Sequence, residues 1–379
     1  MISIYIRPPK EANTDKLWKL RKYVYGLKQA SRKWYLKISK ELKKLGVTMS
    51  KMDEAFFYWY HEGKLAGLVA GHVDDFFWCG SAEFERQVID EITSRFQISS
   101  DLHDSFTFLG LKVHQLPSGV ILNQDNYADK IQYLPQQTEL SKMNECTSDE
   151  KDSLRSVIGQ LSWIGNQTRP DISANVCQLS SNLKNATKSD VTLANKTIRK
   201  VRVDKLSLKF PKLNLNELQL VVHSDASHNN LPKGGSQGGY IVFLGDNEGK
   251  VAPIQWQSKR IKRVVRSTLA AECLALEEAV DHAFYMKGML SEIMKVDIPM
   301  HCSVDCRSLV DNLHSSNTVK EEKRLVQDIS LLKEMMEKKE INSVQHVISK
   351  NNLADALTKR GASCQLLEDV LSSGYLKKY

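Results

Sequence analysis

Leu218-Gln-Leu-Val-Val-His-Ser-Asp-Ala-Ser-His228 is the stretch from which the fold of this chain can be predicted. Leu220 and the two valines after it favour a strand, because apolar and β-branched side chains suit a pleated, buried surface. The polar residues 227–230 predict that the strand ends just after Asp225. A carboxylate at the end of a buried strand is costly unless something offsets its charge, and a bound metal ion is one way to do so. The alternative is an aspartate that begins a turn.

Three more carboxylates follow Asp225, each at the start or end of a predicted element. Glu272 lies near the start of a long helix, Asp305 at the end of a strand, and Asp355 at the start of a closing helix. Four such oxygen ligands at one sheet edge suit two Mg²⁺ ions about 3.5–4 Å apart, which can activate a water and stabilise the leaving oxygen in phosphodiester cleavage. The alternative for Glu272 alone is that the helix dipole favours an acid there.

The elements around these acids predict an α/β layer with a mixed sheet. The long helix should cover residues 267–294, where the apolar stripe contains one charged residue, Lys287. We therefore expect this helix to reach the surface or bend in its last two turns. Asn352 is expected to cap the closing helix. The strands of this half are expected at residues 218–225, 239–244, 254–257, 301–305 and 341–348, and the remaining helices at 306–313 and 320–338.

The first half of the chain shows a second set of strand and helix patterns. Trp34, Ile38, Leu42 and Leu45 form one apolar helix face opposite lysines. Residues 126–200 are mostly helical in pattern, and the polar, lysine-rich residues 185–216 favour a domain boundary. The other elements are strands at 2–6, 55–60 and 65–70, a helix at 84–96, and two short strands between 106 and 122.

Length and composition limit the class of protein. With 379 residues, the chain is long enough for two or three domains, and a hydrophobic content of 41% is typical of a globular protein. The formal net charge of +8 is compatible with a polyanionic partner without requiring one. Seven cysteines without a CxxC pair predict reduced thiols and no zinc site. No apolar run has membrane-spanning length, so we expect a soluble intracellular protein of the cytoplasm, the nucleus or both.

The C-terminal half contains six short motifs in this order: His223-Ser-Asp-Ala-Ser227, Gly239-Tyr-Ile-Val-Phe-Leu244, Trp256-Gln-Ser-Lys259, Arg266-Ser-Thr-Leu-Ala-Ala-Glu-Cys-Leu-Ala-Leu276, Val304-Asp305 and Leu353-Ala-Asp-Ala-Leu-Thr-Lys359. In these motifs and their order, this half resembles the ribonuclease H of copia-type retrotransposons. The resemblance implies hydrolysis of the RNA strand in RNA/DNA hybrids, with Asp225, Glu272, Asp305 and Asp355 as catalytic ligands of two Mg²⁺ ions. His346 resembles the mobile histidine of some ribonucleases H, although its predicted strand favours a structural role.

The N-terminal half resembles the reverse transcriptase of the same polyproteins. In the segment His72-Val-Asp-Asp75, the resemblance implies that Asp74 and Asp75 form a hairpin that helps to hold catalytic Mg²⁺. A second segment, Val24-Tyr-Gly-Leu-Lys-Gln-Ala-Ser-Arg-Lys-Trp-Tyr35, resembles the family's segment that lines the nucleotide and template site. Two further segments resemble the region between polymerase and ribonuclease H: Ile158-Gly-Gln-Leu-Ser-Trp-Ile164 and Arg169-Pro-Asp-Ile172.

This half also departs from the family pattern. The family's further metal-binding aspartate and its fingers subdomain would precede Met1, and Asp15 and Asp53 stand in the wrong context to replace that aspartate. His72 stands where the family has Tyr, and Ser31 where it has Pro. A two-metal site that lacks a ligand should lose most of its rate, so we expect no DNA synthesis by this chain alone.

Two basic segments are candidates for contact with nucleic acid. Lysines mixed with aromatic residues suit phosphate contact and base stacking, although a solvated helix face over buried aromatics is the alternative for the first segment. The candidates are Lys28, Gln29 and Arg32 in the first segment, and Lys259, Arg260, Lys262 and Arg263 in the second.

Together these patterns predict an α/β (α+β) chain made of a partial polymerase palm, a helical connection and a ribonuclease H-like mixed sheet flanked by helices. The proposed partner is an RNA/DNA hybrid or another nucleic acid. Two alternatives stay open, a catalytically inactive remnant that at most binds nucleic acid and a truncated gene model of an active polymerase. The predicted divisions are residues 1–125 for the palm, 126–212 for the helical thumb or connection with its linker, 213–362 for the ribonuclease H-like domain, and 363–379 for a tail.

Overall fold

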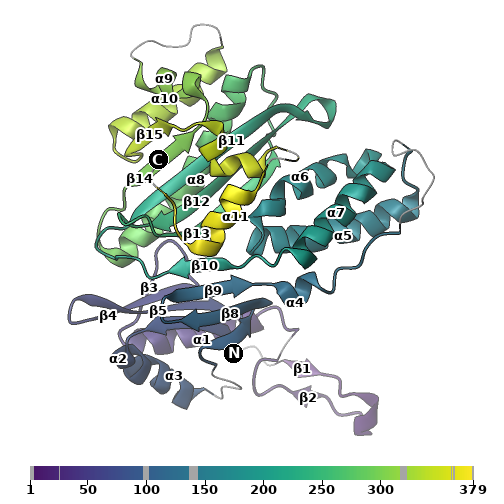
Figure 1. Cartoon of the computed structure of the whole chain (residues 1–379). Helices are drawn as coiled ribbons and strands as arrows, with labels where there is room; N and C mark the ends of the chain where they lie inside the picture. The colour runs from purple at the N-terminus through teal and green to yellow at the C-terminus, as the bar shows by residue number, and fades with distance from the viewer. Residues whose placement is uncertain are drawn as a thin grey trace. The chain divides into compact units, whose positions relative to one another are not determined.

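The computed structural model describes residues 4–24, 26–96, 102–135, 144–315, 322–359, 361 and 363–377. The chain separates into two compact units (Figure 1). The first comprises Met1–Asp101 with Glu292–Met294, and the second Leu102–Ser291 with Lys295–Tyr379. Within the described residues, no helix is long and apolar enough to cross a membrane. The domain divisions proposed from the sequence remain predictions.

The first unit is built on a four-stranded antiparallel sheet in the order β3-β4-β5-β6. Its core joins Ile38 and Leu42 of one helix to Phe57, Trp59 and Val69 of the sheet. The strands and helices expected between residues 31 and 96 are confirmed. The elements are a β1–β2 ribbon (Tyr5–Ile6 and Trp18–Lys19), α1 (Ala30–Lys44), β3 (Thr48–Met49), β4 (Phe56–His61), β5 (Lys64–His72), β6 (Asp75–Gly80), and a helix built from α2 (Ala82–Phe84), a π-helical turn (Glu85–Ile89) and α3 (Asp90–Arg95).

The second unit begins with a four-stranded antiparallel sheet in the order β10-β9-β8-β7. Two of these strands lie between residues 106 and 123, about as expected, but a tight turn at Leu109 and Gly110 separates off a further strand that the sequence did not predict. Both residues have positive φ, 49° and 80°, and a leucine in that conformation is not a usual turn signal. The strands are β7 (Ser105–Phe108), β8 (Leu111–Leu116), β9 (Gly119–Asn123) and β10 (Leu208–Pro211).

Helices occupy most of the chain between β9 and β10, as expected. Capping boxes begin two of them, at Thr147 with Glu150 and at Thr187 with Asp190. The lysine-rich residues 188–203 form a helix whose apolar side, including Ile198 and Val201, is buried in one hydrophobic core with the other helices of this region. The elements are α4 (Asp125–Ala128), α5 (Ser148–Gln167), η3 (Pro170–Ile172), α6 (Ser173–Asn182), η4 (Leu183–Asn185) and α7 (Lys188–Val203).

A five-stranded mixed sheet in the order β13-β12-β11-β14-β15 forms the rest of the second unit. The strand pairs β11–β14 and β14–β15 are parallel, and the other pairs are antiparallel. The strands are β11 (Gln219–Leu231), β12 (Gly235–Gly245), β13 (Val251–Arg260), β14 (Met300–Val304) and β15 (Ser343–His346). The expected order of strands and helices is confirmed.

One strand end differs from the prediction. β11 does not end after Asp225 but continues to Leu231, with an irregular register between Ser227 and Leu231. Antiparallel pairing with β12 supplies backbone hydrogen bonds past the point where the side chains become polar, and this pairing extends the strand. Asp225 therefore lies inside a strand rather than at its end.

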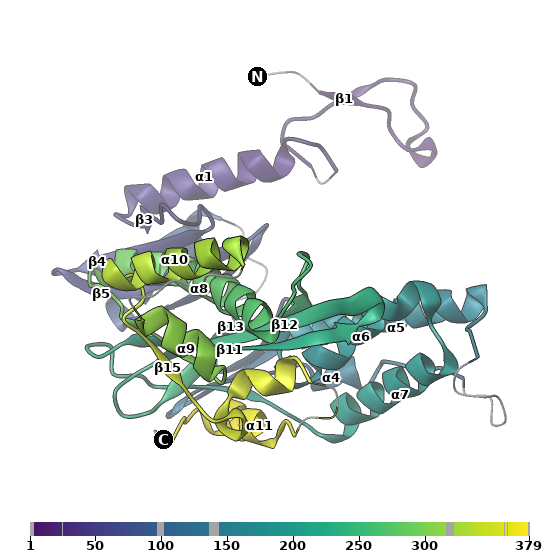
Figure 2. The same cartoon turned by 90° about the horizontal axis from the view of Figure 1, so that it is seen from above.

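Helices cover both faces of this sheet (Figure 2). A Cβ atom at Gly238 would lie 3.5 Å from Ala275 of α8, whereas one at the adjacent Gly239 would lie 2.8 Å from Leu357 of η7. Because successive residues of a strand face opposite sides, α8 and η7 lie on opposite faces. The elements are α8 (Thr268–Met294), α9 (Arg307–His314), α10 (Lys323–Glu337), η6 (Ser349–Asn351), η7 (Leu353–Leu357) and α11 (Gln365–Ser373).

The expectation that α8 surfaces or bends at Lys287 is wrong. The residue is 6% exposed, and its ammonium group lies 3.3 and 3.4 Å from the backbone oxygens of Lys339 and Glu340. It also lies 3.2 Å from an oxygen of Asp297. These contacts satisfy the buried charge, so the helix can run on to Met294.

Candidate metal centre

Parallel pairing brings Asp225 and Asp305 to the same place in the sheet. The last residues paired between β11 and β14 are His223 and Ser303, and Asp225 and Asp305 each lie two positions further along. Asp305 directly follows the end of β14, so no further residues of that strand cover this part of β11. Asp225 is fully buried and Asp305 half-buried. The continued register therefore places their carboxylates side by side.

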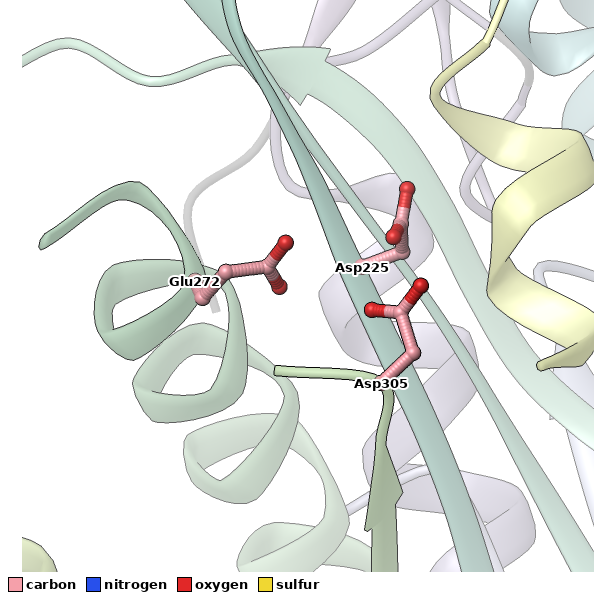
Figure 3. Close-up of side chains that lie close together, drawn as sticks. All are labelled: Asp225, Glu272 and Asp305. Carbon is pink, nitrogen blue, oxygen red and sulfur yellow. The ribbon is translucent and has the colours of Figure 1, made fainter. Parts of the chain in front are cut away.

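Small residues allow the helix that carries Glu272 to lie close to the same edge. Ala271 and Ala275 of α8 pack against Ala226 of β11, next to the aspartate. The helix begins at the cap Ser267, whose hydroxyl accepts a hydrogen bond of 3.2 Å from the amide of Ala270. Glu272 in the second turn is 4% exposed and projects toward Asp225 and Asp305 (Figure 3).

The three acids form a compact group of potential ligands. Asp225, Glu272 and Asp305 each offer one oxygen, and these oxygens lie within 4.8 Å of one another. Oδ1 of Asp225 and Oε2 of Glu272 are buried and have no hydrogen-bond partner among the described residues. Unpartnered buried carboxylate oxygens are rare unless a cation is expected there, and hard oxygen donors suit Mg²⁺. The residues present therefore fit a divalent cation.

Burial changes the protonation of two of these acids. It raises the pKa of Asp225 to about 6, against the opposing effects of the Thr358 hydrogen bond and the Lys359 charge. Burial, followed by the charges of Asp225 and Asp305, raises the pKa of Glu272 to about 9. Without a bound cation, Glu272 therefore holds a proton at neutral pH.

The fourth predicted acid, Asp355, is connected to this group through a lysine. Its carboxylate accepts a hydrogen bond from the ammonium group of Lys359. The same nitrogen lies 3.6 Å from Oδ1 of Asp225 and 3.9 Å from Oδ2 of Asp305. Asp355 does not belong to the compact group of three found among the described residues.

Five hydrogen bonds fix the segment that carries Asp355 and Lys359. Asn352 donates to the backbone oxygen of Ser224 at 2.9 Å, and its side chain also accepts from the amide of Ala354, which confirms the predicted cap. The side chains of Gln237 and Asn230 donate to the backbone oxygens of Leu357 and Thr358 at 3.2 and 3.3 Å, and the Thr358 hydroxyl donates to Asp225.

The roles of Thr358, Lys359 and Gln237 were missed by the sequence reasoning. The first two lie in the quoted motif that ends at residue 359, so their place beside Asp355 was the available signal. Gln237 carries no such signal, because its contact depends on how β12 meets η7.

The structure places the predicted polymerase residues on the first unit. Asp74 and Asp75 lie at the β5–β6 hairpin, where His72 pairs with Asp75, so the predicted hairpin is confirmed. Both aspartates are exposed, and they do not belong to a group of three potential metal ligands within the described residues. Lys28, Gln29 and Arg32 are exposed at the start of α1.

The basic residues after β13 lie on the second unit, and part of their charge is compensated. Lys259 pairs with Glu278 of α8, and Arg263 pairs with Asp328 of α10. Arg260 covers Gly235, where an added Cβ atom would meet its guanidinium group, and Lys262 is exposed. A cavity of about 450 Å³ is lined by further cations that the sequence reasoning missed, together with Arg263: Arg266, Lys323 and Arg324.

Comparisons with known proteins agree with this architecture. Residues 1–150 match the family model described as reverse transcriptase (RNA-dependent DNA polymerase). The chain is 27% identical to the Retrovirus-related Pol polyprotein from transposon RE1 of Arabidopsis thaliana, over 93% of this chain and 25% of that protein. It is 30% identical to the transposon Ty5-1 protein of Saccharomyces cerevisiae, over 73% of this chain and 94% of that protein.

A solved structure shares the fold at low sequence identity. The foamy viral protease-reverse transcriptase in complex with an RNA/DNA hybrid matches with a TM-score of 0.52 and 14% identity, over 87% of this chain and 39% of that one. The chain spans about a quarter of the length of the Arabidopsis relatives. The resemblance expected from the sequence motifs is confirmed. The chain therefore belongs to the copia/Ty1-type retrotransposon Pol proteins, with a reverse-transcriptase region followed by a ribonuclease H-like mixed sheet.

Proposed function

We propose that the mixed sheet of this chain hydrolyses the RNA strand of RNA/DNA hybrids in a Mg²⁺-dependent reaction. The observation that carries the proposal is the group formed by Asp225, Glu272 and Asp305, with two buried oxygens that lack partners among the described residues. Asp355, at the edge of the group, would supply a fourth ligand. The foamy viral relative of this fold was solved with such a hybrid, which supports the choice of substrate.

The acids would act as the ligands of two Mg²⁺ ions. When bound, these ions would supply activation of water and stabilisation of the charge that develops on the leaving oxygen. The buried position of Asp225 and Glu272 keeps their oxygens fixed, so little reorganisation is needed at the moment of reaction. Glu272 must release its proton before its carboxylate can serve as a ligand.

Basic side chains near the start of α8 would hold the phosphate backbone. Lys262 and Arg266 are exposed, and Arg266 shares a cavity with Lys323 and Arg324 at the start of α10. Lysine and arginine contacts to phosphates supply affinity without reading the base sequence. This suits an enzyme that must act on hybrids of any sequence.

For the first unit, we propose that this chain alone does not synthesise DNA. Asp74 and Asp75 form an exposed pair that lacks a third acid in the described part of the chain. A phosphoryl-transfer site depends on the position and charge of its ions, which two exposed carboxylates hold poorly.

The test is cleavage of a labelled RNA strand in an RNA/DNA hybrid with Mg²⁺. The chain should cleave the hybrid, and its Asp225→Asn variant should not, whereas Asp149→Asn at an exposed position of α5 should cleave normally. If Asp225→Asn still cleaved the hybrid, the activity would not depend on the acid group that contains Asp225. Absence of cleavage by folded wild-type protein would contradict the proposal and favour an inactive, nucleic-acid-binding remnant.

A further inference from the structure

The ammonium group of Lys359 lies beside three of the four acids of the candidate metal centre. Its ammonium group donates to Asp355 and lies 3.6 and 3.9 Å from oxygens of Asp225 and Asp305. These acids belong to three separate parts of the fold, η7, β11 and the residue after β14. In the described part of the chain, no other lysine or arginine lies within 4.0 Å of the carboxylates of Asp225 or Asp305.

The electrostatic setting explains why a cation belongs there. Burial disfavours the charged form of Lys359, but Asp355, Asp225 and Asp305 outweigh this effect and raise the pKa of the amine. Like charges held at close range in a poorly solvated site repel one another strongly. The ammonium group therefore lets these acids approach one another without a metal ion.

The same position conflicts with metal binding. Mg²⁺ requires carboxylate oxygens at about 2.0–2.1 Å, so an ion held by Asp225 and Asp305 would lie next to the present ammonium position. Two cations at that separation repel each other, and Lys359 offers no lone pair to the metal while it is protonated. Either cation can compensate the acids, but both cannot do so from this place.

We propose that Lys359 is a built-in counter-ion that holds Asp225, Asp305 and Asp355 together before a metal binds, and that moves aside when Mg²⁺ enters. The inference rests on the proposed function, because it concerns the loading of the same site. It makes Lys359 a positioning residue rather than a metal ligand. It also makes the apparent affinity for Mg²⁺ weaker than the acids alone would give, because the metal must displace a bound cation.

A cavity gives the displaced side chain a place to lie. Lys359 lines a cavity of about 430 Å³ whose other lining residues include Asn182, Asp190, Ser227 and Asn230. The Asp190 carboxylate is fixed in this wall, because it accepts hydrogen bonds of 2.8 Å from both the Asn182 side chain and the Thr187 amide. The cavity thus offers polar acceptors and a negative charge to the Lys359 side chain.

The test measures Mg²⁺ binding by calorimetry in the absence of nucleic acid. Lys359→Met removes the charge and keeps the length of the side chain, and it should bind Mg²⁺ about tenfold more tightly than the wild type, within the usual range for two coupled binding events. Lys359→Arg keeps the charge and should gain no affinity. The matched control is Lys250→Met, because Lys250 is 39% exposed against 40% for Lys359 and pairs with one acid, Glu248, away from the group.

Melting temperatures provide a second test that does not depend on enzymatic activity. In EDTA, Lys359→Met should melt at a lower temperature than Lys250→Met, and Mg²⁺ should raise its melting temperature more than that of the wild type. If Lys359→Met does not fold, Lys359→Gln takes its place in both comparisons.

Equal or weaker Mg²⁺ binding by the neutral variant would overturn the inference, while hybrid cleavage by the wild type would leave the proposed function standing. If Lys359→Met bound Mg²⁺ and the wild type did not, this result would support the inference most strongly. If neither protein bound Mg²⁺, the inference would be overturned, and the cleavage assay would decide the proposed function separately.

Discussion

The two sets of candidate metal ligands in this chain differ in burial rather than in chemistry. Asp74 and Asp75 on the first unit are exposed at a hairpin turn. Asp225 and Glu272 on the second unit are 0% and 4% exposed, and each keeps an oxygen without a hydrogen-bond partner in the described part of the chain. An exposed pair of acids needs no cation, whereas a buried group is stable only with protons, a lysine or a metal ion. The comparison explains why a pair of adjacent acids in a sequence is weaker evidence than acids that the fold buries together.

The largest expected effect comes from removing a ligand of the buried group. Asp225→Asn or Glu272→Gln should lower hybrid cleavage by roughly 100-fold or more, because each variant weakens the charge that fixes the metal ions. Asp74→Asn and Asp75→Asn should leave hybrid cleavage unchanged. Single-turnover cleavage rates of the four variants check this contrast. A similar loss in both pairs would show that the hairpin acids take part in the same reaction.

The next effect concerns the close approach of η7 to the sheet. A Cβ atom at Gly239 would lie 2.8 Å from side-chain carbons of both Leu357 and Thr358. Gly239→Ala should therefore displace η7 and destabilise the second unit by about 1–3 kcal/mol. It should also lower the rate of hybrid cleavage, because Asp355 lies in η7 and moves with it.

Gly159→Ala is the matched control for this substitution. Gly159 lies inside α5 with nothing within 4 Å of the added carbon, so the change should stabilise the protein by about 0.5–1 kcal/mol. Denaturant unfolding measures both variants. An equal effect of the two substitutions would contradict the role assigned to the contact between Gly239 and η7.

A third effect appears in the dependence of stability on pH. A carboxyl group with a raised pKa binds its proton more tightly in the folded protein, so folding loses stability as pH rises from the unfolded value, about 4.3 for glutamate, toward the folded value. For Glu272 the folded pKa is about 9. Metal-free wild type should therefore lose stability relative to Glu272→Gln between these limits.

Melting temperatures in EDTA across this pH range test the difference between the two proteins. Added Mg²⁺ should stabilise the wild type more at higher pH, because the proton leaves more easily. Parallel curves for wild type and Glu272→Gln would count against a buried, protonated Glu272.

The smallest effect is expected on the basic surface near the starts of α8 and α10. Arg266→Ala and Lys323→Ala should each weaken hybrid binding several-fold. Each should also reduce the slope of log affinity against log salt concentration by about one unit. Arg155→Ala, at an exposed position of α5, should change neither quantity. Fluorescence anisotropy at several salt concentrations provides the measurement. An unchanged salt dependence would exclude these two side chains from the phosphate contacts.

The sequence predicted the order of strands and helices along the second half of the chain and the Asn352 cap of η7, because periodic apolar residues and local capping signals determine these features. It misplaced the end of β11, since pairing with a distant strand decided where that strand stops. It also misjudged Lys287, whose partners at Asp297, Lys339 and Glu340 become neighbours only after folding. Local patterns thus determine elements, and long-range contacts decide their ends and their buried charges.

The same division applies to the candidate site. Each of the four acids could be picked out from its place at the edge of a predicted element, with the family resemblance to support the choice. The position of Lys359 among them could not, because it depends on how η7 lies on β11 and β12. Likewise, the spacing of residues in the sequence does not predict that Asp355 lies outside the compact group of three, because this depends on the folded geometry.

A metal site at these acids is tested most directly by a crystal structure of the wild-type chain grown with Mn²⁺. This ion can replace Mg²⁺ at oxygen ligands and is located by its anomalous scattering. We expect two metal peaks about 3.5–4 Å apart among Asp225, Glu272 and Asp305, with Asp355 nearby and Lys359 turned away from the acids. A well-ordered sheet with no metal at these carboxylates, and with Lys359 still bound to Asp355, would contradict this expectation.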